Sequence, residues 1–168
     1  IGKAVLRRAR CFGMKLLGTD IIPIAPDFIL ENGVEMVALK TLLQRSDFVS
    51  LNCTLNSTSR YLINRRTLRY MKETAVLINT ARGPLIKEAD LMDALRNKAL
   101  AGAALDVFES EPLPLDSPFL KMDSVLLAPH NSNSSPAAWE RVHWNTILNL
   151  LDGLSIPHPD FEQIKSTQ

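Results

Sequence analysis

The stretch that decides the fold is Ala75-Val-Leu-Ile-Asn-Thr-Ala-Arg-Gly83. Residues 75–80 form an apolar, strand-like segment that ends in a polar turn carrying Arg82, and Gly83 is expected to let the backbone turn sharply there. In an open parallel sheet, ligands bind outside the carboxyl ends of the strands. A lone arginine is ordinarily a solvated surface charge, but one at a strand end is expected to face a binding site.

Two later apolar runs end in the same way. Residues 102–107 lead into a loop with Glu111, and residues 124–129 lead into His130. Either residue alone would ordinarily be a loop acid or a satisfied core histidine. Because all three side chains follow strands, we expect Arg82, Glu111 and His130 at one sheet edge. The set combines an anion-binding guanidinium, an orienting carboxylate and an imidazole that exchanges a proton.

Hydrophobic periodicity and turn residues define the remaining elements. Strands are predicted over 15–20, 48–53, 75–80, 102–107 and 124–128, and helices over 1–12, 37–45, 65–71 (capped by Asn64), 87–98 and from near Pro136, capped by Ser134 or Ser135, to near Gly153. Prolines predict irregular backbone over 21–27 and 109–120. Strands that alternate with helices predict a doubly wound α/β fold with a parallel sheet covered on both faces. We expect one domain over residues 1–153, followed by a tail over 154–168.

Composition narrows the class of protein. The 168 residues are 46% hydrophobic and carry a net charge of +1, so no basic footprint indicates a nucleic-acid partner. No apolar run approaches the ~20 residues of a membrane span, and no signal segment opens the chain. Only two cysteines are present, Cys11 and Cys53, which favours a reducing cytoplasm. His143 and His158 are interpreted as structural or solvated.

A partial nucleotide-binding pattern opens the chain. Gly2 begins the first predicted helix, and Asp20 ends the next strand. In dinucleotide-binding folds such a glycine allows the helix to approach the sheet, and the acid binds ribose hydroxyls. The pattern is weak by itself, since any helix can start with glycine. Asp20 followed by Ile21 and Ile22, without an arginine, favours NAD over NADP.

Four ordered motifs carry a family resemblance: Ser46-Asp-Phe-Val-Ser-Leu51, Leu77-Ile-Asn-Thr-Ala-Arg-Gly83, Gly102-Ala-Ala-Leu-Asp-Val-Phe108 with Glu111-Pro112, and Ala128-Pro-His130. The chain resembles the nucleotide-binding domain of the D-isomer-specific 2-hydroxyacid dehydrogenases over about residues 1–153. The resemblance implies a Rossmann-like domain, NAD as cofactor, a small 2-hydroxy or 2-keto acid as substrate, a homodimer and no metal.

The resemblance also implies roles for individual residues. Arg82 would bind the substrate carboxylate and polarise its carbonyl, His130 would be the general acid and base at the C2 oxygen, and Glu111 would orient His130. The implied cofactor contacts are Ile1 and Gly2 under the pyrophosphate, Asp20 on the adenosine ribose, Cys53 and Thr54 along the adenine, Thr80 and Ala81 beside the nicotinamide, Asp106 at the carboxamide, and Asn131.

The sequence departs from the family pattern at several positions. The first strand and the first two glycines of the fingerprint are absent, as is the separate substrate domain, so we expect this chain alone to be unstable, to bind dinucleotide poorly and to be inactive. Asn52-Cys-Thr54 replaces a common His-x-Pro, Lys87 replaces a common helix-capping acid, and Asn131-Ser-Asn-Ser134 replaces an apolar-Ala-Gly run. These later departures bear on cofactor contacts and on the choice of 2-hydroxy acid.

Two other functions stay open from the sequence. Residues 51–56 and 109–112 also resemble the NAD-sensing corepressors of the C-terminal-binding-protein type, which are similar at Arg82, Glu111 and His130 as well. An inactive dehydrogenase fragment is the third possibility.

Overall fold

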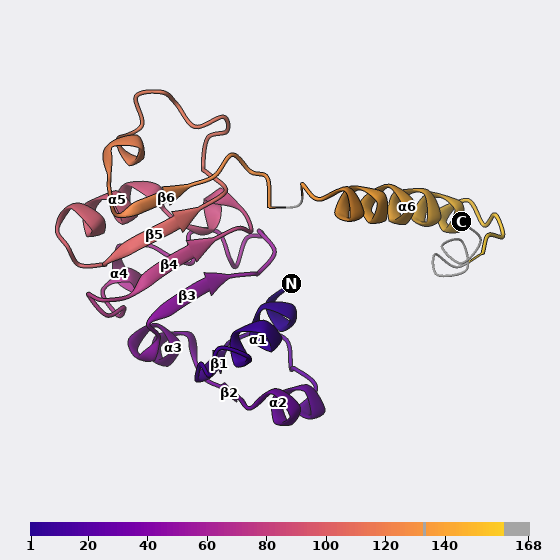
Figure 1. The fold of residues 1–168 in the computed structure, drawn as a ribbon, viewed down its shortest axis with the longest axis horizontal. Coiled ribbons are helices and arrows are strands. Elements are labelled where there is room, and N and C mark those ends of the chain that lie inside the picture. The colour runs from indigo at the N-terminus through magenta and orange to yellow at the C-terminus, as the bar shows by residue number, and fades with distance from the viewer. Residues whose placement is uncertain (133, 160–168) are drawn as a thin grey trace. The chain divides into compact units, whose positions relative to one another are not determined.

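The structure is a computed structural model that describes residues 1–132 and 134–159 (Figure 1). The chain divides into two compact units. The first covers Ile1–His130, and the second begins at Asn131. All described strands and the candidate site residues up to His130 belong to the first unit.

The strands form two parallel sheets. β1 (Leu16–Gly18) pairs with β2 (Val34–Met36) in the smaller sheet. The larger sheet has the order β3-β4-β5-β6, with bounds of Phe48–Leu51, Val76–Asn79, Gly102–Leu105 and Val125–Leu127. The predicted α/β class and the parallel pairing are confirmed. The sequence predicted one sheet, whereas the structure pairs the strands in two.

The helices connect these strands as the alternating pattern requires. In the first unit they are α1 (Gly2–Arg10), α2 (Pro26–Asn32), α3 (Leu39–Arg45), α4 (Arg65–Leu68) and α5 (Glu88–Arg96), with 3-10 turns at Gly83–Leu85 and Pro118–Lys121. Asn64 caps α4, as the sequence predicted. Its side chain accepts the backbone N–H of Thr67, and the Thr67 side chain accepts the backbone N–H of Asn64.

Two predictions about this unit are wrong. The region 21–27 was predicted to be irregular, but Pro26 begins α2, because proline is well tolerated in the first turn of a helix. Neither α2 nor β2 was predicted, since both are short and only Phe28, Asn32 and Val34 are buried in them. The loop 109–120 is also not wholly irregular, because its last proline, Pro118, begins a 3-10 turn.

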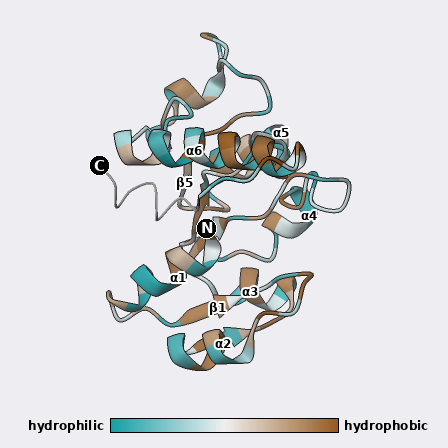
Figure 2. Ribbon diagram, turned by 90° about the vertical axis from the view of Figure 1, so that its right-hand side faces the viewer, coloured by the Kyte–Doolittle hydropathy of each residue, from teal (hydrophilic) through white to brown (hydrophobic). Residues whose placement is uncertain are grey.

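The main core lies around the larger sheet. Fully buried side chains come from the strands and from the segments that cover them: Leu43, Ile63, Leu77, Leu85, Leu91 and Phe119. A smaller cluster of Leu16, Phe28 and Val34 supports the β1-β2 sheet. Figure 2 shows hydrophobic residues along β1 and β5 and hydrophilic ones on α1 and α2. The larger sheet is therefore the better-supported platform for the site at its carboxyl edge.

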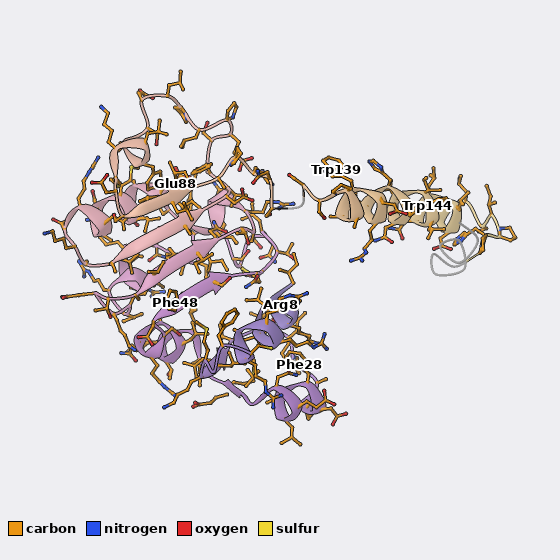
Figure 3. All side chains as sticks on the ribbon, in the orientation of Figure 1. Arg8, Phe28, Phe48, Glu88, Trp139 and Trp144 are labelled. Carbon is orange, nitrogen blue, oxygen red and sulfur yellow. The ribbon has the colours of Figure 1, made fainter. Side chains whose placement is uncertain are left out.

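The second unit contains α6 (Pro136–Gly153). Ser135 caps it by accepting a hydrogen bond from the Ala138 N–H at 3.2 Å, and Pro136 occupies its first turn, as predicted. Trp139, labelled in Figure 3, is half exposed. Part of the predicted tail, residues 160–168, lies outside the described residues, and the division at residue 153 stays a prediction. In the described part of the chain, no helix is long and apolar enough to cross a membrane.

Candidate active site

Three adjacent strands deliver the predicted catalytic residues to one edge of the larger sheet. Arg82 follows β4, Glu111 follows β5, and His130 follows β6, and these strands pair in that order. Parallel strands end at the same edge, so the three side chains emerge on one side of the sheet. The structure therefore brings together the set that the strand ends predicted.

Glu111 and His130 form a direct pair. Glu111 Oε2 lies 2.7 Å from His130 Nδ1, and Glu111 Oε1 accepts the Phe108 N–H at 2.9 Å. The Phe108 N–H, followed by the imidazole, holds the pKa of the Glu111 carboxyl below its ordinary value, and the positive charge of Arg82 adds to the effect. Glu111 is thus ionised at neutral pH and acts as an acceptor toward the ring.

A cavity of about 400 Å³ adjoins this pair. His130 lines it from a backbone with φ of 55°, an uncommon conformation for a residue with a side chain. The other lining residues are mostly apolar: Phe108, Pro112, Leu113, Leu120 and Leu127. An apolar cavity with a small number of oriented polar groups is the usual form of a small-molecule site.

The turn that presents Arg82 is held from inside by Asn79. The Asn79 side chain is fully buried, donates from Nδ2 to the Arg82 carbonyl at 2.9 Å, and accepts the Ala81 N–H at 3.1 Å. Sequence reasoning missed this role. A polar residue at the last position of an otherwise apolar strand was the available signal, because a buried amide needs partners.

Gly83 is required for a reason other than the predicted sharp turn. Its φ is not in the left-handed region. A Cβ at this position would lie 1.9 Å from both the carbonyl carbon and oxygen of Phe108, so no side chain fits. The turn after Arg82 therefore rests directly on the loop that carries Glu111.

The same loop is tied to α5 by two glutamates. The Glu88 N–H donates to Glu109 Oε2 at 3.2 Å, and the Glu109 N–H donates to Glu88 Oε1 at 2.5 Å. Burial raises the pKa of Glu88, the Glu109 N–H opposes the rise, and the charges of Glu109 and Glu111 add to it. Sequence reasoning missed the pair, because the residues lie 21 positions apart and neither stands in a motif that predicts contact. Figure 3 labels Glu88.

The predicted adenosine contacts lie beside the smaller sheet and the end of β3. Asp20 is exposed after β1 and accepts the Ile22 N–H at 3.1 Å. Partial burial of the thiol raises the pKa of Cys53, and the negative charge of Asp20 adds to the rise. Gly2, at the start of α1, would place a Cβ only 3.4 Å from Asn52 Cβ. A helix start, a carboxylate and a strand end therefore converge, which fits the adenosine half of a dinucleotide.

The remaining predicted cofactor residues are placed as follows. Thr80 is exposed and Ala81 half-buried in the turn before Arg82, while Ile1 and Thr54 are exposed. Asp106 is buried after β5, and its N–H donates to the Asn79 carbonyl at 3.0 Å. Asn131 begins the second unit, so its cofactor contact stays a prediction. The Thr80, Ala81 and Asp106 positions border the same sheet edge as Arg82.

Known proteins share both the sequence and the fold. The profile of the D-isomer specific 2-hydroxyacid dehydrogenase NAD binding domain matches residues 1–132. A glyoxylate reductase of Korarchaeum cryptofilum is 46% identical over 151 residues, which cover 90% of this chain and 45% of that protein. The holo forms of Rhodotorula graminis D-mandelate dehydrogenase superpose with a TM-score of 0.83 at 32% identity, covering 89% of this chain and 44% of that one.

The chain belongs to the D-isomer specific 2-hydroxyacid dehydrogenase family and comprises its NAD-binding domain. The NAD-complexed form of a D-isomer specific 2-hydroxyacid dehydrogenase from Lactobacillus delbrueckii has a TM-score of 0.81 at 26% identity, over 94% of this chain and 51% of that one. The chain thus spans about half the length of the relatives that it matches. The named relatives are enzymes and give the corepressor alternative no support.

Proposed function

We propose that the protein carrying this chain is an NAD-dependent oxidoreductase that interconverts a D-2-hydroxy acid and its 2-keto acid. The observation that carries the proposal is the 2.7 Å contact between Glu111 Oε2 and His130 Nδ1 on the sheet edge where Arg82 emerges. An oriented imidazole and a guanidinium at one sheet edge suit a substrate that has a carboxylate adjacent to a carbonyl. Membership of the family supports the same reaction.

His130 is proposed to move the proton. The ionised Glu111 carboxylate favours the tautomer with the proton on Nδ1, which leaves Nε2 as the nitrogen that faces the substrate oxygen. During reduction, a protonated His130 donates from Nε2 to the C2 oxygen. During oxidation, neutral His130 accepts the hydroxyl proton. Glu111 orients the ring in both directions and stabilises its positive charge.

Arg82 is proposed to bind the substrate carboxylate. Its planar guanidinium donates two parallel hydrogen bonds to a carboxylate, a geometry that lysine cannot reproduce. The guanidinium Nη1 contacts the Ala81 carbonyl at 2.6 Å, which anchors one side of the group. Binding the carboxylate at the sheet edge would present C2 and its oxygen to His130.

The cofactor supplies the redox chemistry: NADH, when bound, donates the hydride that C2 accepts. Asp20 is proposed to accept hydrogen bonds from the two hydroxyls of the adenosine ribose, which disfavours a 2′-phosphate. The other proposed contacts are Ile1 and Gly2 at the pyrophosphate, Cys53 and Thr54 along the adenine, and Thr80, Ala81, Asp106 and Asn131 toward the nicotinamide.

A substrate panel tests the proposal. NADH consumption is measured with 2-keto acids from glyoxylate to phenylglyoxylate, a range suggested by the names of the relatives above. We expect turnover of at least one acid, reduced about 100-fold or more in His130→Ala, since general acid catalysis contributes that much. A protein that binds NADH but reduces none of the acids would contradict the proposal and favour an inactive or NAD-sensing module.

We also propose a cytoplasmic homodimer. The two cysteines of the sequence, Cys11 and Cys53, are both free and exposed, which suits a reducing compartment. Ile21 and Ile22 are consecutive large apolar side chains with exposed fractions of 83% and 66%, and exposed apolar patches mark association surfaces. Sedimentation equilibrium measures the assembly, and a monomer at micromolar concentration would rule the dimer out.

A further inference from the structure

A second cavity, of about 480 Å³, lies between the first turns of α4 and α5. It shares no lining residue with the cavity beside His130. Its charged lining consists of Arg65, Arg66, Arg69, Lys87 and Asp90. Asp93, outside the lining, pairs with Arg65 at 2.9 Å, so four cations against two carboxylates leave an excess of two positive charges here, in a chain whose whole net charge is +1.

Asp90 neutralises only part of this positive charge. Its side chain is 9% exposed, and Oδ2 accepts the Arg65 N–H at 2.8 Å. Oδ1 lies 3.8 Å from Arg65 Nε and 3.9 Å from Lys87 Nζ. The buried carboxylate is therefore satisfied from inside the protein, and it fixes Arg65 and Lys87 at the wall of the cavity.

Arg66 and Arg69 carry the uncompensated charge. Both are exposed, and within residues 1–132 and 134–159 neither guanidinium has a protein hydrogen-bond partner or an acid within ion-pair distance. Their positions, three apart around the short α4, put both on the cavity lining. Two guanidiniums without acids on one cavity attract a multivalent anion.

The stability of α4 does not account for Arg66. Arg65 and Arg66 are its first two residues, where the helix dipole favours acids and disfavours positive charge. The first N–H groups already have acceptors, because Asn64 Oδ1 takes those of Arg66 and Thr67. Asp90 and Asp93 compensate Arg65, whereas Arg66 carries a local electrostatic cost that folding does not require, a pattern expected at functional positions.

We propose that this cavity binds a compact multivalent oxyanion of the phosphate class, of the size of a diphosphate group. The Arg66 and Arg69 guanidiniums would each donate paired hydrogen bonds to phosphate oxygens. Lys87, the residue at the N-cap position of α5, contributes a third charge to the lining. The site is separate from the substrate carboxylate site at Arg82, so it stands whether or not the protein reduces 2-keto acids.

Calorimetric titration of the NAD-saturated protein with inorganic pyrophosphate at constant ionic strength tests the site, because NAD then occupies the pyrophosphate contacts proposed at Ile1 and Gly2. We expect saturable binding to one site, weakened at least about tenfold in Arg66→Gln/Arg69→Gln, because hydrogen bonds between charged groups are worth that much or more. Arg96→Gln is the control for lost surface charge: it removes one positive charge, against two in the double variant, from an exposed arginine outside the cavity and should change the affinity less than about twofold.

Other results overturn the proposal. Absence of saturable binding, or an equal loss of affinity in Arg96→Gln, would show that these arginines are only solvated surface charge. Binding of a single-stranded oligonucleotide that pyrophosphate fails to displace would show a nucleic-acid surface in place of a small-anion site. The thermal midpoint of each variant verifies folding, and Lys87→Gln provides a second, independent removal of cavity charge if the double variant does not fold.

Discussion

Gly83 packs against the carbonyl of Phe108 so closely that a Cβ at position 83 would lie 1.9 Å from it. This contact joins the turn after Arg82 to the loop that positions Glu111, because the Phe108 N–H is also the donor to Glu111 Oε1. The spacing between the anion-binding residue and the proton-transfer pair is thus set by backbone contact. We infer that the two halves of the site move only together.

Gly83→Ala should therefore damage both stability and turnover. The methyl group forces the two backbone segments apart, and overpacking of this kind costs about 1–3 kcal/mol of unfolding free energy. Chemical denaturation measures the loss. Gly153→Ala is the control, because a Cβ at the end of α6 would meet no atom within 4 Å. Equal stability of the two variants would show that the Phe108 contact yields readily.

Glu111→Gln should reduce kcat/KM for keto acid reduction by about 100-fold, because an amide has no charge to stabilise the protonated imidazole and only one acceptor oxygen for the Phe108 N–H and His130 Nδ1. His130→Ala and the Glu111→Gln/His130→Ala double variant should have equal residual rates, since Glu111 acts through His130. Glu73→Gln, an exposed glutamate elsewhere, serves as the control. A double variant much slower than His130→Ala would assign Glu111 a separate role.

Arg82→Lys should raise the KM for the keto acid almost as much as Arg82→Ala, because lysine keeps the charge but loses the paired hydrogen bonds. The loss of a charged hydrogen bond corresponds to roughly 10- to 100-fold in affinity. Arg96→Lys should leave the KM unchanged. Full activity in Arg82→Lys would mean that positive charge alone suffices and that paired hydrogen bonds from the guanidinium do not hold the carboxylate.

Asp20→Asn should narrow the preference for NADH over NADPH. Its carboxylate would repel a 2′-phosphate, and the neutral amide removes that repulsion. The ratio of kcat/KM for the two cofactors measures the effect, with Asp27→Asn as the control. If wild type already uses both cofactors equally, Asp20 does not contact the ribose.

Glu88→Gln should change how stability depends on pH. A carboxyl whose pKa is higher in the folded chain, as for Glu88, stabilises the fold most at low pH, and this contribution falls as pH rises through the folded pKa. The thermal midpoint of Glu88→Gln, relative to that of wild type, should therefore rise as the pH increases from about 4 to about 7. Glu111 has the opposite sign, since its lowered pKa favours the fold above its ordinary value of 4.5. A difference in thermal midpoint between Glu88→Gln and wild type that does not change with pH would contradict the burial of Glu88.

Strand ends were the most predictive signal in the sequence. Arg82, Glu111 and His130 each follow a strongly apolar run. Because those runs pair as parallel strands, the three residues must lie at the same edge of the sheet. Capping residues were equally predictive, since Asn64 and Ser135 act within a few residues of their own position. Helix caps can be predicted from the sequence because they do not depend on the tertiary fold.

What the sequence did not predict depends on contacts between distant segments. The Glu88 and Glu109 pair forms only once α5 meets the β5 loop, and the need for Gly83 arises from Phe108. α2 and β2 were missed because a three-residue strand and a helix of about two turns that begins at a proline carry too little periodicity. Pairing in two sheets in place of one likewise follows from tertiary hydrogen bonds.

The fate of the hydride tests the central claim most directly. The protein is incubated with NADH that carries deuterium at both C4 positions of the nicotinamide and with the 2-keto acid that it turns over, and the product is analysed by NMR and by chiral chromatography. We predict deuterium on C2 of the D-hydroxy acid, with formation of this product strongly reduced in His130→Ala and in Arg82→Ala. Product without deuterium at C2, or an L-hydroxy acid, would contradict hydride transfer at a site built from Arg82, Glu111 and His130.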